Sequence, residues 1–182
     1  MKSKFATRRM AGVALLLSLC AIAMPVAWGQ KSDWRPATDT ELAALLPARA
    51  PVEKEHIETE MRTANGITDG KGHFIAGVIL ITAGYSADGK YSHYLVAQTP
   101  IRIGGVNLPA GQYVFGWQKE KDGESLSLHF HEALTGKLIG NAQAHKIVGT
   151  TRVESLRIWP PSEKEIIQIG RYMLPYELEG DR

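Results

Sequence analysis

The chain has 182 residues and a mass of 20.0 kDa, a length that predicts a single domain. Apolar residues make up 44% and charged residues 22%, proportions that exclude a disordered or collagen-like chain. The formal net charge is +2, but four basic residues lie in a predicted leader. The remaining 17 basic and 19 acidic residues give −2, which argues against nucleic acid as a partner.

The first 29 residues have the three zones of a secretory signal peptide. A basic start precedes the apolar stretch 11–24, and Ala27 and Gly29 place small residues before a cleavage site. The apolar stretch is shorter than the ~20 residues of a membrane-spanning helix, so we predict cleavage, no membrane span afterwards, and a periplasmic or secreted protein. The leader is compatible with export by either the Sec or the twin-arginine route. Cys20, the single cysteine, lies in this leader, so the mature chain has no disulfide.

Residues 30–52 are predicted to form a loose tail, one short helix and a linker. Thr38 and Glu41 match the N-cap and N3 positions of a capping box. Three leucines follow at helical spacing: Leu42, Leu45 and Leu46. Pro47 ends this run, so we expect a helix of about two turns and then a linker over residues 48–52.

From residue 53 onward, strand and turn signals predict a β domain that extends to residue 182. Runs rich in β-branched and aromatic residues lie at 73–83, 91–98, 112–119, 124–131, 152–159 and 165–174. Pairs that supply positive φ angles for turns are Asn65-Gly66, Asp69-Gly70, Asp88-Gly89, Asp122-Gly123 and Thr135-Gly136. Short strands separated by such turns predict an all-β fold, an antiparallel β-sandwich of about seven to nine strands.

Two hairpins can be tested for consistency between their faces. A turn at Asp122-Gly123 places Phe115 opposite Phe130 and Trp117 opposite Leu128. The apolar residues of both strands then lie on the same face of the hairpin. The second hairpin, 77–85 with 90–98, is apolar on both faces. Such strands are central, or they lie beneath the short helix or a partner subunit, which leaves a homodimer open.

The histidines are the candidates for a metal site. His129 and His131 point to the same side of one strand, where a transition metal such as zinc accepts imidazole nitrogens. His145, His93 and Glu132 are the available third ligands. The competing interpretation is that His129 and His131 are solvated or hydrogen-bonded residues of a polar face without a metal, and we favour it.

The aromatic residues offer a different kind of site. Tyr113, Phe115 and Trp117 form a stripe that suits sugar stacking, but its agreement with the opposite strand favours a place in the core. Trp159, which precedes two prolines, is the better exposed aromatic residue, and we take it with Gln118 as the ligand-binding candidates. We assign no catalytic residue, since the sequence contains no phosphate loop or dinucleotide fingerprint.

The segment Leu-Pro-Ala-Gly-Gln-Tyr at 108–113 follows a tight turn and a short strand. It resembles a turn found in an uncharacterised family of exported bacterial β-sandwich domains, and in prealbumin-like or carboxypeptidase-regulatory-like domains. The resemblance spans residues 99–161 and implies a β-sandwich and export. It implies no catalytic residue, because its motif is a turn.

These observations predict a non-catalytic binding or accessory module, with a protein, a glycan or a small molecule as its ligand. Recognition is expected on the His129/His131 face, or on the loops that carry Trp159 and residues 104–111. The alternative is a metal-binding protein or small metalloenzyme built on His129 and His131.

Overall fold

The computed structural model describes residues 33–150 and 152–178, and the predicted signal peptide lies outside them. The described residues form one α-helix, α1 (Asp39–Leu45), and thirteen β-strands. The strands are β1 (Arg35–Pro36), β2 (Arg49–Val52), β3 (Glu55–Thr68), β4 (Phe74–Leu80), β5 (His93–Ala97), β6 (Ile101–Ile103), β7 (Val106–Leu108), β8 (Gly111–Lys119), β9 (Ser125–Glu132), β10 (Leu138–Lys146), β11 (Glu154–Ile158), β12 (Ile166–Gly170) and β13 (Tyr172–Leu178).

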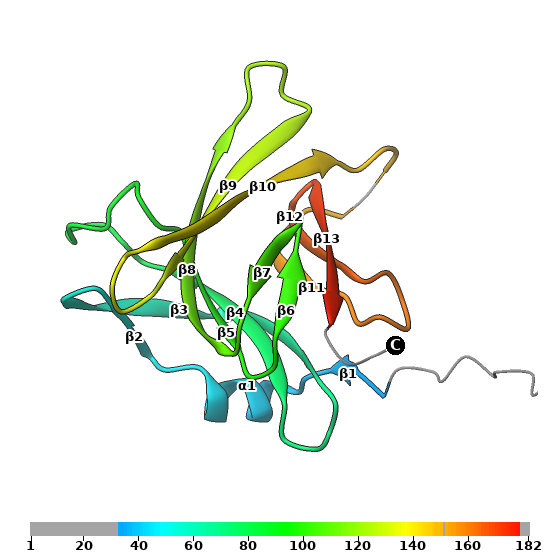
Figure 1. The fold of residues 1–182 in the computed structure, drawn as a ribbon, viewed down its shortest axis with the longest axis horizontal. Helices are drawn as coiled ribbons and strands as arrows, with labels where there is room; N and C mark the ends of the chain where they lie inside the picture. The colour runs from blue at the N-terminus through cyan, green and yellow to red at the C-terminus, as the bar shows by residue number, and fades with distance from the viewer. Residues whose placement is uncertain (1–32, 151, 179–182) are drawn as a thin grey trace, which may run out of the picture. The chain divides into compact units, whose positions relative to one another are not determined.

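Ten strands follow one another in a nearly closed, barrel-like antiparallel sheet, in the order β1-β3-β4-β5-β8-β9-β10-β13-β12-β11 (Figure 1). The last strand returns to the first ones: the Ile158 N–H donates to Oδ1 of Asn65 at 2.7 Å, and Leu156 lies against Gly77. The predicted all-β antiparallel class and the single short helix are confirmed for the described residues. The sandwich of about seven to nine strands was wrong, because alternation along a strand is the same whether the sheet faces a second sheet or closes on itself.

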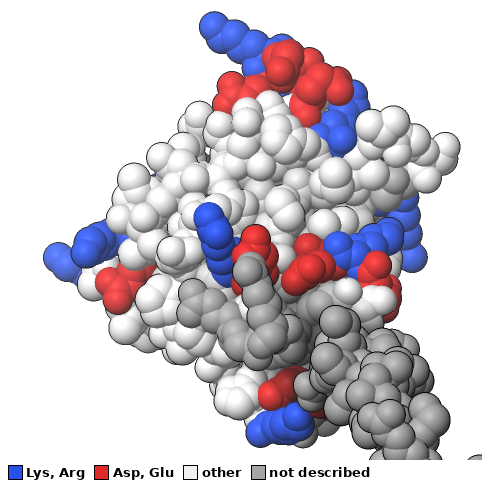
Figure 2. Space-filling model, turned by 45° about the vertical axis from the view of Figure 1, so that its right-hand side comes forward, with Lys and Arg blue, Asp and Glu red and all other residues white. Residues whose placement is uncertain are grey.

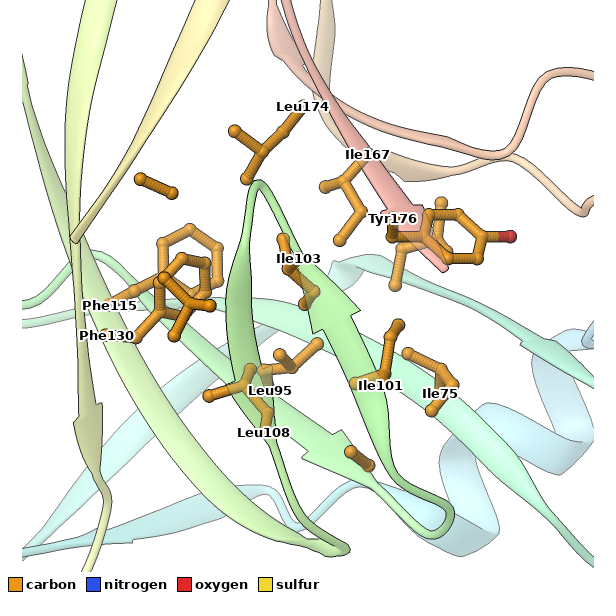
Figure 3. Packing of buried hydrophobic residues seen from close by; sticks show 14 of the residues in the cluster. Ile75, Leu95, Ile101, Ile103, Leu108, Phe115, Phe130, Ile167, Leu174 and Tyr176 are labelled. Atoms are coloured by element: carbon orange, nitrogen blue, oxygen red, sulfur yellow. The ribbon is translucent and has the colours of Figure 1, made fainter. Parts of the chain in front are cut away.

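The interior of the barrel is filled by apolar side chains from the surrounding strands and from the β6–β7 hairpin (Figure 3). β6 pairs with the second half of β13, where Ile103 lies opposite Tyr176. The turn of this hairpin packs closely, since a Cβ at Gly104 would lie 2.8 Å from Cβ of Ala142. The hairpin joins the end of β5 to the start of β8, so it occupies that end of the interior.

A second apolar layer covers the outer face of β4 and β5. Leu42 of α1 and Leu46, which follows the helix, belong to one buried cluster with Val78 and Tyr94, whose side chains point away from the barrel interior. Both strands have a neighbour on each side in the sheet, so the structure shows the expected alternative of a central position.

Strand β3 continues across Asn65-Gly66 without a turn, so the prediction of a turn at this pair was wrong. A Cβ at Gly66 would lie 2.6 Å from Cβ of Ala76 and 2.7 Å from the carbonyl oxygen of Ile75. Glycine is needed here because two backbones approach closely, not because a turn requires it. The other four pairs lie in turns, and their glycines have positive φ angles: Gly70, Gly89, Gly123 and Gly136.

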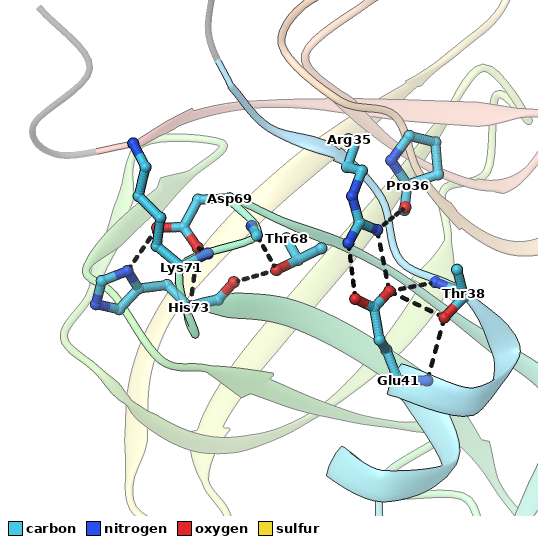
Figure 4. A network of polar contacts seen from close by, with 9 residues as sticks. Arg35, Pro36, Thr38, Glu41, Thr68, Asp69, Lys71 and His73 are labelled. Carbon is cyan, nitrogen blue, oxygen red and sulfur yellow. Dashed lines mark hydrogen bonds and ion pairs between the residues drawn. The ribbon is translucent and has the colours of Figure 1, made fainter.

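The segment before the helix is tied to the barrel by β1, which pairs with β3, whereas a loose tail was predicted. The capping box is present, and Arg35 adds an ion pair to Glu41 at 2.7 Å (Figure 4). These contacts lower the pKa of Glu41 to about 2, with the Arg35 hydrogen bond as the largest cause. The predicted linker at 48–52 forms β2, which pairs with β3. The propensity of this segment is low, so its strand depends on that pairing.

Candidate functional site

One end of the barrel interior opens into a cavity of about 420 Å³, which we call the mouth cavity. Glu154 of β11 lines it, beyond a register shift in that strand. Six other strands each place one inward residue on its wall: Ile79, His93, Trp117, Leu126, Ile169 and Tyr172. Their direction follows from strand alternation, because residues at the same parity on these strands belong to the interior core. The β6–β7 hairpin closes the other end. Concave, mostly apolar sites in the mouths of barrels are preferred places for small ligands.

The β8–β9 hairpin carries part of this wall in the predicted register, with Phe115 opposite Phe130 and Trp117 opposite Leu128. Tyr113 and Phe115 are buried as expected, but 43% of Trp117 is exposed. The expectation of a core position was therefore wrong for Trp117. Its side chain points inward at the level where the barrel opens, so one side of it faces the cavity.

His93 is the polar residue most deeply buried at the mouth, with 3% of its surface exposed. Its ring stacks on Phe115, with a centroid distance of 4.7 Å and an interplanar angle of 4°. Nδ1 lies 2.8 Å from Oγ of Ser92, which fixes the ring from one side. Nε2 is buried and has no hydrogen-bond partner among the described residues. A buried polar atom of this kind calls for an explanation, and a bound molecule would supply the missing partner.

Burial lowers the pKa of His93 to about 4, because the apolar surroundings disfavour the charged imidazolium. The backbone of Ser155 opposes this shift, although it does not meet the geometry of a hydrogen bond to the ring. The imidazole is therefore neutral at pH 7. It can donate or accept one hydrogen bond at Nε2 without carrying charge into the cavity.

The opposite wall is held in place by Gln168, a buried residue of β12. Its Nε2 donates to the carbonyl oxygens of Arg152 and Gly170, at 2.7 and 3.0 Å. Its Oε1 accepts the indole N–H of Trp159 at 3.2 Å. These bonds position the chain that leads into Glu154, a lining residue whose carboxylate lies 3.4 Å from Nε of Arg152.

The predicted metal ligands lie apart from the mouth cavity. His129 and His131 are on the outward face of β9, and Nδ1 of His129 lies 2.8 Å from Oδ1 of Asn141. His145 is exposed on β10, opposite Ser125. No group of three or more histidine, cysteine or acidic side chains in residues 33–150 and 152–178 is arranged to hold a metal ion. The structure thus brings no third ligand to the pair.

His131 belongs instead to a cluster on the outer face of the barrel. It meets the ring of Tyr91 edge-on at 5.1 Å, and Nδ1 is buried without a partner in the described part of the chain. Burial lowers its pKa. Glu53 accepts hydrogen bonds from Nζ of Lys90 and from the hydroxyl of Tyr91, at 2.6 and 2.7 Å. Glu53, Lys90 and Tyr91 satisfy one another, so we assign these three a packing role.

The two predicted ligand-binding residues are not brought together. Trp159 follows β11, at the end away from the cavity wall, and its ring lies 4.0 Å from both Cζ of Arg157 and Nζ of Lys164. These cations cover ring surface that a sugar would need. Gln118 is exposed on the outward face of β8, next to Trp117. Sequence reasoning did not select His93 as a ligand-binding residue, although a histidine at an inward position of an apolar strand was a usable signal.

The charged residues on the face in Figure 2 are spread over the surface with both signs interspersed. This agrees with the small net charge and offers no broad single-sign patch on that face. Within the described residues, no helix has the length and apolar character needed to cross a membrane. No protein-family model, curated protein or solved structure matches the chain.

Proposed function

We propose that the chain is a non-catalytic binding protein that holds a small apolar molecule in the mouth cavity. The observation that carries this proposal is the buried Nε2 of His93, which points to a ligand group that completes its hydrogen bonding. The surrounding wall is mostly apolar, with Ile79, Trp117 and Leu126 among its members. A few polar groups inside a mostly apolar cavity are the usual composition of a site that fixes the orientation of a small ligand.

The size of the cavity supports a small molecule over a peptide or a glycan chain. Its volume of about 420 Å³ lies within the ~300–1,000 Å³ that is usual for small-molecule sites. The proposal retains the expectation of a periplasmic or secreted protein, which depends on residues 1–29 alone.

Nile red, an uncharged dye whose fluorescence rises in apolar surroundings, tests this proposal on the purified protein. We expect saturable binding with one dye per chain. The variant Val153→Trp should weaken that binding by about tenfold, since Val153 lines the cavity and a larger side chain would occupy it.

The matched control is Val148→Trp, at a position that is 98% exposed and does not line the cavity. It adds the same indole group to the protein surface, so it should leave dye binding unchanged. The proposal is contradicted if the dye does not bind, or if the two variants bind it equally well. Circular dichroism of both variants shows whether each is folded.

A further inference from the structure

The charges around the mouth cavity restrict what it can hold. Among the described residues that line it, Glu154 carries the only full charge, and none is lysine or arginine. The side chain of Glu154 is 17% exposed, so solvent screens it less than a surface carboxylate. Arg152, its ionic partner, is 86% exposed and lies outside the cavity lining. An anionic group inside the cavity would therefore meet a like charge and no cation.

The neutral state of His93 leads to the same conclusion. Its ring is stacked on Phe115 and its Nδ1 lies against Oγ of Ser92, so Nε2 is the ring nitrogen that still lacks a hydrogen-bond partner. Burial opposes protonation of the ring, so His93 does not offer a positive charge to a carboxylate at pH 7. A hydroxyl group can donate to Nε2 or accept from it, and it therefore suits either neutral tautomer.

We infer that the ligand is an uncharged apolar molecule that directs a hydroxyl group to Nε2 of His93, an inference that rests on the proposed binding function. The Glu154 carboxylate excludes fatty-acid-like anions, and the apolar walls receive the hydrocarbon part. His93 determines the orientation of the ligand in the cavity, and Glu154 selects an uncharged ligand over an anion.

Displacement of Nile red by three matched probes at pH 7.5 tests this inference: 1-octanol, octanoate and 1-chlorooctane. We expect 1-octanol to displace the dye at a concentration about tenfold lower than octanoate. Glu154→Gln should improve displacement by octanoate about threefold, since it removes the like charge and keeps the side-chain volume.

The role of His93 is read from a ratio of dissociation constants. 1-Chlorooctane has the same chain but no hydroxyl, so the preference for 1-octanol over it should fall about fivefold in His93→Leu, as expected for one lost hydrogen bond. This ratio compares two probes on one variant, so it does not depend on how much functional protein is present.

The outcomes separate the two levels of the argument. If neither the dye nor any of the three probes binds, the proposed function is wrong. If the probes bind but octanoate equals 1-octanol, the exclusion of anions is wrong. If His93→Leu keeps the preference for 1-octanol over 1-chlorooctane, the hydroxyl contact with His93 is wrong.

Discussion

Replacing His93 by leucine should remove a large part of the acid sensitivity of the fold. Burial lowers the pKa of the folded imidazole to about 4, whereas an unfolded histidine titrates near 6.5. Between these two pH values the unfolded chain binds a proton that the folded chain does not bind. The free energy of unfolding therefore falls as the pH falls from about 6.5 to about 4, and this loss ends below the folded pKa.

The magnitude follows from the difference between the folded pKa of about 4 and the unfolded pKa near 6.5, which corresponds to about 3 kcal/mol in full. About 1 kcal/mol of it is lost by pH 5.5, and most of it by pH 4. No discount for solvent screening is needed, because 3% of the residue is exposed. Against a typical stability of about 5–15 kcal/mol for a domain, this loss is large.

Urea unfolding of wild type and His93→Leu, followed by circular dichroism at several pH values between 7.5 and 4, measures this effect. The difference between the two proteins isolates His93, because every other titrating group is common to both. Leu126→Ala serves as the control: it disturbs the same cavity wall without removing a titratable group, so its pH profile should parallel wild type. Parallel profiles for His93→Leu and wild type would refute the argument that His93 is buried in its neutral form.

Two further substitutions test the packing that surrounds the site. Gly66→Ala should lower the free energy of unfolding by about 3 kcal/mol, because the new methyl group would meet the backbone of β4. A Cβ at Gly70 would meet no other residue within 4 Å, so Gly70→Ala should lower it by only about 1 kcal/mol, through the positive φ. Urea unfolding measures both changes. Gln168→Leu should cost about 2–3 kcal/mol, because it leaves the carbonyl oxygens of Arg152 and Gly170 without their buried donor, and similar stability in the two proteins would contradict this.

The local parts of the fold followed from the sequence where short-range chemistry decides them. The capping box of Thr38 and Glu41 satisfies the first backbone N–H groups of a helix whatever the helix packs against. The register of β8 and β9 followed because only one pairing brings Phe115 opposite Phe130 with both strands presenting their apolar residues to the same side.

The closure of the sheet into a barrel could not be predicted from such short-range patterns in the sequence. β10 contributes Ala142 and Ala144 to the interior, and neither alanine signals a strand. β6 and β7 have three residues each, and the hairpin that they form joins the sheet only through the pairing of β6 with β13. Asn65-Gly66 has the composition of a turn, but β4 on one side and β11 on the other hold it extended.

The candidate site was missed because it is a consequence of closure. Each strand contributes one or two residues to the mouth, so the residues lie far apart in the chain. His93 and Glu154 approach one cavity only after β11 returns to β3. The sequence predicted a possible metal site at His129 and His131 because they are two residues apart on one strand. The structure provides no third ligand for them within the described residues.

The mouth is also where the chain departs from what stability alone would select. A leucine at position 93 would continue the apolar inward row of β5, would leave no buried Nε2 without a partner, and would remove the loss of about 3 kcal/mol in acid. Departures of this kind are expected at functional sites, where a local cost accompanies a specific interaction. His93→Leu should therefore have two linked effects: greater resistance to acid and a weaker preference for a hydroxyl-bearing ligand. Greater resistance to acid without the change in preference would mean that this histidine is a tolerated defect of the core and has no role in binding.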